Sequence, residues 1–197
     1  MSRPHEKGAR RPTLPGNWTL GGTGVPEGLE ALAGQIVVRW GFLEQQFDAL
    51  LSISAGSKGL GKAIRSRVRG SRNRRELLAA IAKEALTENE RLLVQPLLGR
   101  YVALVAERNV YVHGVWGAHS AYPGEAILAR DDAVIDTQHF DAAIRLSDLR
   151  ERVFNDMVLV SDRDLSRFLR EMDALTGDLI EAFYAIQGQR LKQQMGL

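Results

Sequence analysis

Apolar residues recur along most of this chain at intervals of three and four, which is the period of an amphipathic helix. The first such series follows Pro26 and consists of Leu29, Leu32, Ile36, Trp40, Leu43, Phe47 and Leu50. A short basic helix is predicted over residues 60–68, and Ser71 is placed to cap a further helix that continues to about Ala85. The pattern therefore predicts several amphipathic helices in the first half of the chain.

Two capping boxes mark the starts of two later helices. Thr87 with Glu90, and Ser161 with Asp164, have the spacing at which two side chains satisfy the first amide groups of a helix. The helix after Thr87 carries the apolar stripe Leu93, Leu97, Tyr101 and Leu104. The helix after Ser161 carries Leu165, Phe168, Leu169, Met172, Leu175, Leu179 and Phe183. We expect the earlier of these helices to end at Gly114, because glycine commonly follows a last helical turn.

Residues 115–160 show a different pattern, with turn-forming residues between short apolar runs. The turn signal Tyr122-Pro123-Gly124 precedes two short β-compatible runs at 126–129 and 133–135, while residues 147–160 fit either a helix or a strand that ends near Val160. The sequence therefore predicts a mainly α protein. Its expected form is an up-and-down helical bundle of four to five helices, with a small β-hairpin insertion between the helix ending at Gly114 and the last helix.

The chain has 197 residues, which suits one globular domain. We expect a flexible basic tail over residues 1–25, a helical domain over 26–188 with the β-containing insertion at 115–160, and a C-terminal tail over 189–197. Cysteine is absent, so the sequence predicts a cytoplasmic protein without disulfides. Apolar runs fall far short of the roughly 20 residues that cross a bilayer. Neither a membrane partner nor a metal or other cofactor is expected.

Positive charge is concentrated in one segment. Between residues 58 and 75 there is no acidic residue, and the cations are Lys58, Lys62, Arg65, Arg67, Arg69, Arg72, Arg74 and Arg75. Such a segment would attract a polyanion, and without interleaved aromatic residues it would contact phosphates rather than bases. A solvated surface face remains an equal alternative. We take these residues as candidate nucleic-acid-binding residues.

One helix end concentrates chemically useful groups. In the run Arg108-Asn109-Val110-Tyr111-Val112-His113, helical geometry places Arg108 on the same side as the apolar stripe. Burying an unpaired charge is costly, so that guanidinium should meet a carboxylate, a polar pocket or an anionic ligand. Asn109 and His113 lie four positions apart and share a neighbouring face. Arg108, Asn109 and His113, called the triad below, are the candidate catalytic residues.

These residues give the chain a resemblance to the HEPN family, small helical bundles marked by an arginine, a polar residue, three further residues and a histidine near a helix end. The run Gly114-Val115-Trp116-Gly117 and the segment 40–51 look like an uncharacterised bacterial branch of that family. The resemblance spans about residues 26–188. It departs from some toxin members at Val115, where those members carry a tyrosine that a partner antitoxin modifies.

The resemblance implies a homodimer in which the motif helices of two protomers pair, and metal-independent cleavage of RNA in the cleft between them. His113 would be the general acid or base, Arg108 would stabilise charge on the phosphate, and Asn109 would orient both. A toxin or defence component with an antitoxin or other protein partner fits this expectation. The alternative is a non-catalytic bundle that binds nucleic acid or a protein. A purely structural role for the triad, with Arg108 paired to an acidic residue, also stays open.

Overall fold

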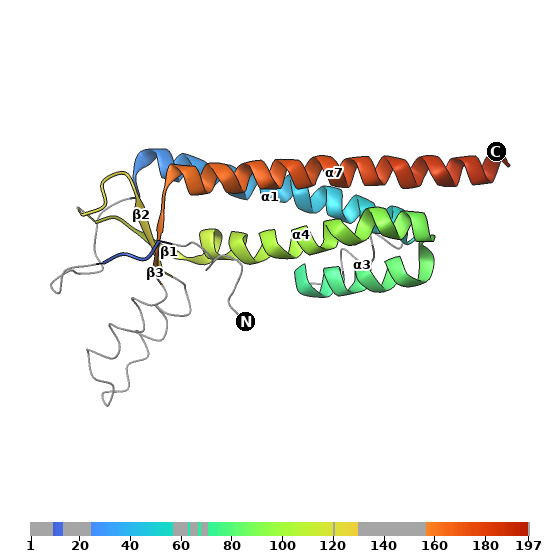
Figure 1. The fold of residues 1–197 in the computed structure, drawn as a ribbon, viewed down its shortest axis with the longest axis horizontal. Coiled ribbons are helices and arrows are strands. Elements are labelled where there is room, and N and C mark those ends of the chain that lie inside the picture. Colours follow the sequence, from blue (N-terminus) through green and yellow to red (C-terminus); the bar gives the residue numbers. More distant parts are fainter. Residues whose placement is uncertain are drawn as a thin grey trace, which may run out of the picture. The chain divides into compact units, whose positions relative to one another are not determined.

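The computed structural model describes residues 10–13, 25–56, 63, 67, 71–119, 121–129 and 157–196 (Figure 1). Its helices are α1 (Glu27–Ser54), α3 (Ser71–Ala85), α4 (Glu88–His113) and α7 (Asp162–Met195). Three short strands complete it: β1 (Val115–Gly117), β2 (Ala126–Ala129) and β3 (Met157–Val160). The prediction of a mainly helical protein with a small β insertion between α4 and α7 is confirmed.

The chain forms two compact units, each assembled from separated segments. The first unit contains Met1–Val37 and Ala106–Leu169, and the second contains Val38–Val105 and Arg170–Leu197. Helices α1, α4 and α7 each begin in one unit and end in the other. The sheet and the triad therefore belong to the first unit, and the described residues of the second unit are mainly helical.

The core of the second unit is built around stacked aromatic rings. The ring of Tyr101 on α4 lies between Phe47 and Trp40 of α1, with centroids 4.1 Å and 5.8 Å away. At its start, α4 carries the predicted capping box, since the backbone N–H of Thr87 donates to Glu90 Oε2 at 2.8 Å. Val94 is fully buried and continues the three-and-four spacing of Leu97, Tyr101 and Leu104. The sequence analysis placed Leu93 in that stripe, but Leu93 is 39% exposed and its neighbour Val94 takes the buried position. The prediction for Leu93 was therefore wrong.

The C-terminal end of α7 is part of this second unit. Arg190 donates through Nε to Glu90 Oε1 at 3.1 Å, and through Nη1 to the backbone carbonyl of Ile53 near the end of α1. One guanidinium thus joins three helices. The segment 189–197, expected to be a tail, is helical as far as Met195.

The sheet of the first unit has the order β1-β2-β3, with both pairings antiparallel. Strand β2 lies between β1 and β3, and the second β-compatible run, at 133–135, lies outside the described residues. The strand expected near Val160 is confirmed as β3, whereas β1 was not predicted. The second predicted capping box forms at the start of α7, where Ser161 N donates to Asp164 Oδ2 at 3.0 Å.

Part of the expected N-terminal tail is bound to the sheet. The backbone N–H of Leu159 on β3 donates to the carbonyl of Arg10 at 2.8 Å. Arg10 also pairs with Glu125, and the hydroxyl of Tyr122 donates to the carbonyl of Thr13 at 2.9 Å. Residues 10–13 therefore contact the sheet, and the flexible tail predicted for 1–25 otherwise lies almost wholly outside the described residues. None of the described helices is both long enough and apolar enough to cross a membrane.

Candidate functional site

Helix α4 ends at Gly114, and the structure shows why a glycine stands there. Its N–H donates to the carbonyl of Val110 at 2.9 Å, and strand β1 starts at the next residue. A Cβ atom at this position would lie 2.5 Å from both the carbonyl oxygen of Val110 and Cδ1 of Leu128. No side chain fits without moving backbone, so Gly114 lets the end of α4 approach β2 closely.

The last turn of α4 is further fixed by aromatic residues. The indole N–H of Trp116 donates to the backbone carbonyl of Tyr111 at 2.9 Å, one of the carbonyls that a helix end leaves without an internal partner. The ring of Tyr111 packs edge-to-face against Phe168 of α7, with centroids 5.2 Å apart. The turn that carries Asn109 and His113 is therefore attached both to β1 and to α7.

Glu107 is a half-buried acidic residue beside this turn, and it has two partners. Its Oε1 accepts a hydrogen bond from the Tyr111 hydroxyl at 3.0 Å and also forms an ion pair with Arg167 of α7. Burial, followed by the negative charge and hydrogen bond of Glu107, raises the pKa of Tyr111 far above its ordinary value. Tyr111 consequently remains a neutral donor to Glu107, and the carboxylate that precedes Arg108 in the chain already has two partners.

The three predicted catalytic side chains lie together at the end of α4. Arg108 Nη1 lies 3.1 Å from Asn109 Oδ1 and 3.0 Å from His113 Nε2. Arg108 is half-buried, whereas Asn109 and His113 are exposed to solvent. Because a guanidinium can donate but not accept hydrogen bonds, the contact with His113 requires Nε2 to accept, with the ring proton on Nδ1.

This arrangement differs in one respect from the expectation for Arg108. Helical geometry alone directed it to the apolar side, about a third of a turn from the face shared by Asn109 and His113. The long side chain instead reaches round the helix to both residues. The cluster offers a cationic donor and an imidazole nitrogen at one solvent-accessible point, which is what binding a phosphate and moving a proton require.

The predicted nucleic-acid-binding residues are covered only in part. Lys58, Lys62, Arg65 and Arg69 lie outside the described residues. Arg67 is described and exposed. Arg72, Arg74 and Arg75 lie within α3, but their side chains are outside the described part. The prediction that this segment contacts phosphates therefore stays a prediction.

Four residues that shape the site were not singled out by the sequence reading: Glu107, Tyr111, Trp116 and Arg167. The spacing of Glu107 and Tyr111, four positions apart on one helix, was a signal for their contact. Trp116 entered the sequence analysis only as part of the run Gly114-Val115-Trp116-Gly117, and Arg167 is 60 positions from its partner Glu107. Within the described ranges, no three histidine or acidic side chains are grouped so that they could hold a metal ion.

Comparison with known proteins adds no relative to this picture. No protein-family model matches the chain, and no curated protein or solved structure shows significant similarity to it.

Proposed function

We propose that this protein is a metal-independent RNA endonuclease of the HEPN type, and that it acts at an interface between two copies of the chain as a toxin or defence component. The observation that carries the proposal is the direct contact between Arg108 and His113 at the solvent-exposed end of α4, with Asn109 on the same guanidinium nitrogen. A cationic donor and an imidazole nitrogen lie side by side, and the contacts of the last turn of α4 with β1 and α7 hold them in position.

The contact between Arg108 and His113 suggests how the site exchanges partners when RNA binds. The N–H groups of Arg108 would turn from His113 to the non-bridging oxygens of a phosphodiester, because charged donors bind phosphate oxygens strongly. His113 Nε2, no longer occupied, then accepts the proton of the neighbouring ribose 2′-hydroxyl. Asn109 holds the guanidinium in position during the exchange.

The chemical step balances without an added co-reactant. The 2′-oxygen attacks the adjacent phosphorus as its proton passes to an imidazole, and the bond from phosphorus to the 5′-oxygen breaks. A protonated imidazole returns a proton to that leaving oxygen, which gives a 2′,3′-cyclic phosphate and a 5′-hydroxyl. DNA lacks the 2′-hydroxyl and is not a substrate for this step.

Pairing of two chains is part of the proposal. When the motif helices of two copies meet, two arginines and two histidines border one cleft, so one imidazole can act as base while the other acts as acid. A strand of RNA lying in that cleft would contact cations from both copies, which favours binding through its phosphates.

The proposal is tested with labelled RNA and a DNA of the same sequence, both incubated with the purified protein in EDTA. We expect cleavage of RNA alone, with cyclic phosphate ends. His113→Ala should lower the rate by about 10²- to 10⁴-fold, the usual contribution of a general acid or base. His119→Ala is the matched control, since His119 lies outside the triad and its ring accepts a hydrogen bond from the backbone N–H of Ala121. Equal RNA cleavage by all of these proteins would refute the proposal, and RNA binding without any cleavage would favour the non-catalytic alternative.

A further inference from the structure

In the second unit, α1 and α7 form one face that carries no charged side chain and exposes several large apolar ones to solvent. Its two stripes have alternating spacings of three and four: Val38, Phe42, Gln45, Ala49 and Ser52 on α1, and Gly177, Ile180, Tyr184, Gln187, Leu191 and Gln194 on α7. This spacing is typical of helices that pack along another helix. We call these eleven positions the α1/α7 face.

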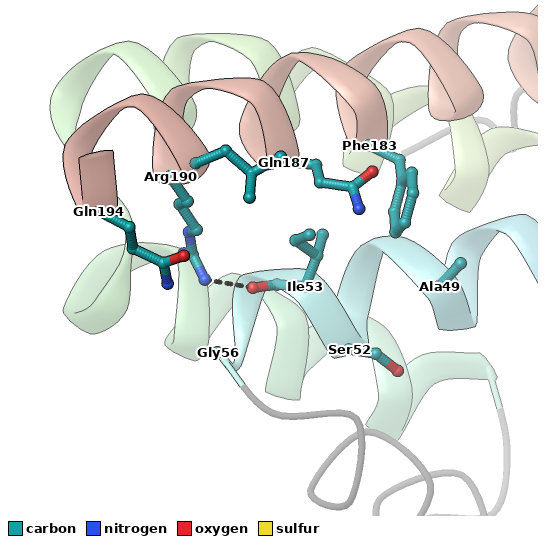
Figure 2. A pocket seen from close by; sticks show the side chains of 9 residues that line it. Ala49, Ser52, Ile53, Gly56, Phe183, Gln187, Arg190 and Gln194 are labelled. Carbon is teal, nitrogen blue, oxygen red and sulfur yellow. Dashed lines mark hydrogen bonds between the residues drawn. The ribbon is translucent and has the colours of Figure 1, made fainter. Parts of the chain in front are cut away.

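The two stripes are adjacent in space. Arg39 of α1 pairs with Asp173 of α7 near one end of the face, and Arg190 binds the Ile53 carbonyl near the other. Between the C-terminal ends of the stripes lies a groove of about 400 Å³, lined by side chains that include Ala49, Ser52 and Gln187, as Figure 2 shows. The α1/α7 face is therefore one continuous surface and not two separate patches.

Large apolar side chains of this face are exposed. The exposed fractions are 75% for Val38, 51% for Phe42, 63% for Tyr184 and 50% for Leu191. Met195, at the end of α7, is 64% exposed beside them. Single exposed apolar residues are ordinary, but a contiguous apolar stripe over two helices marks an interaction surface.

The charge of the face indicates what covers it. None of its eleven positions is charged, although 25% of the whole chain is. Arg39, at the border of the face, pairs with Asp173, and Arg190, which lines the groove, pairs with Glu90. A surface whose cations are already paired within the chain offers little to a nucleic acid or an anionic membrane.

A two-fold interface presses a surface against its own copy, so any charge near the axis meets a like charge. An uncharged face with evenly spaced apolar ridges avoids that repulsion and is complementary to itself. We infer that the α1/α7 face packs against the same face of a second copy of this chain. The inference goes beyond the proposed function, because it concerns other residues than the triad and does not depend on RNA cleavage.

The test is the molar mass of the full-length protein, measured by light scattering at micromolar concentration. The wild type should show a multiple of the 21.8 kDa chain mass, and Phe42→Glu or Leu191→Glu should halve it. Leu92→Glu is the matched control, since Leu92 is 62% exposed on α4 and lies outside the face. It should leave the mass unchanged. Far-UV circular dichroism should show the same helix content in all four proteins.

A milder variant covers the case in which the glutamate of Phe42→Glu or Leu191→Glu disturbs folding. Tyr184→Ala should keep its helix content and raise the dissociation constant of the assembly about tenfold or more, as expected for an aromatic anchor. A monomeric wild type, unchanged masses in both glutamate variants, or an equal loss of mass in Leu92→Glu would overturn the inference. Variants of Arg108 and His113 should keep the wild-type mass, so failure of the RNA proposal is distinguishable from failure of this one.

Discussion

The guanidinium of Arg108 lies 3.0 Å from Nε2 of His113, five positions later on the same helix. A permanent cation, which attracts anions, therefore lies beside an imidazole nitrogen, which can accept a proton. The contact places the imidazole nitrogen and the cation so that one phosphodiester could reach both. This relationship is the basis of the proposed activity.

Arg108→Lys should reduce RNA cleavage although the charge is kept. A lysine ammonium is a point charge, and it cannot present the planar set of donors with which Arg108 contacts Asn109 and His113. We expect a loss of about 10²-fold in the rate, at the lower end of what removing one charge-stabilising donor costs. Single-turnover cleavage of labelled RNA measures it. Wild-type rates in this variant would mean that only the charge matters at this position.

Gly114→Ala should destabilise the protein. The added methyl group would lie 2.5 Å from the carbonyl oxygen of Val110, a backbone atom that cannot move freely. Overpacking of this kind costs about 1–3 kcal/mol in the free energy of unfolding. Gly99→Ala, on the same helix, has open space at its Cβ and should stabilise the helix by about 1 kcal/mol. Urea denaturation of both variants checks the signs, and equal effects would contradict this reading of the helix end.

Arg190→Gln should also destabilise the protein. The change removes the partner of Glu90, whose carboxylate is nearly buried, and the donor to the Ile53 carbonyl. Leaving buried polar groups without partners costs about 1–3 kcal/mol. Lys192→Gln, two positions later at an exposed site, serves as the control and should change the unfolding free energy by less than about 0.5 kcal/mol. An unchanged free energy of unfolding in Arg190→Gln would contradict the claim that the contacts of Arg190 stabilise the protein.

Stability should fall at alkaline pH because of Tyr111. Its pKa is raised in the folded chain by burial and by Glu107, so the folded state holds this proton more tightly than the unfolded state does. The resulting stabilisation is fully present below the ordinary tyrosine pKa of 10.0 and is lost as pH rises above that value. Tyr111→Phe should therefore show a shallower loss of stability above pH 10, measured by urea denaturation across pH. An identical alkaline slope in both proteins would contradict the assignment.

Features that depend on neighbours in the sequence were predictable from it. Both capping boxes form between residues three positions apart, and the apolar period located α1, α3, α4 and α7. The order Arg108, Asn109, His113 likewise placed three groups on adjacent turns of one helix. Local spacing was enough in each case because helical geometry fixes which side chains meet.

Features that depend on distant segments were not predictable. Arg190 is 100 positions from Glu90 in the sequence, and no local sequence pattern predicts that they pair. The missed strand β1 is only three residues long and is defined by its partner β2, so its own sequence carries little signal. The tight approach of Gly114 to Leu128 has the same origin, since it follows from that pairing.

The most direct test of the central claim compares RNA cleavage rates of the wild type, Arg108→Ala, His113→Ala and the double variant, in EDTA. If Arg108 and His113 act as one unit on the same phosphodiester, removing the second group after the first should cost little more, and the double variant should cleave about as slowly as the slower single variant. Two losses that simply multiply in the double variant, or four equal rates, would contradict the account.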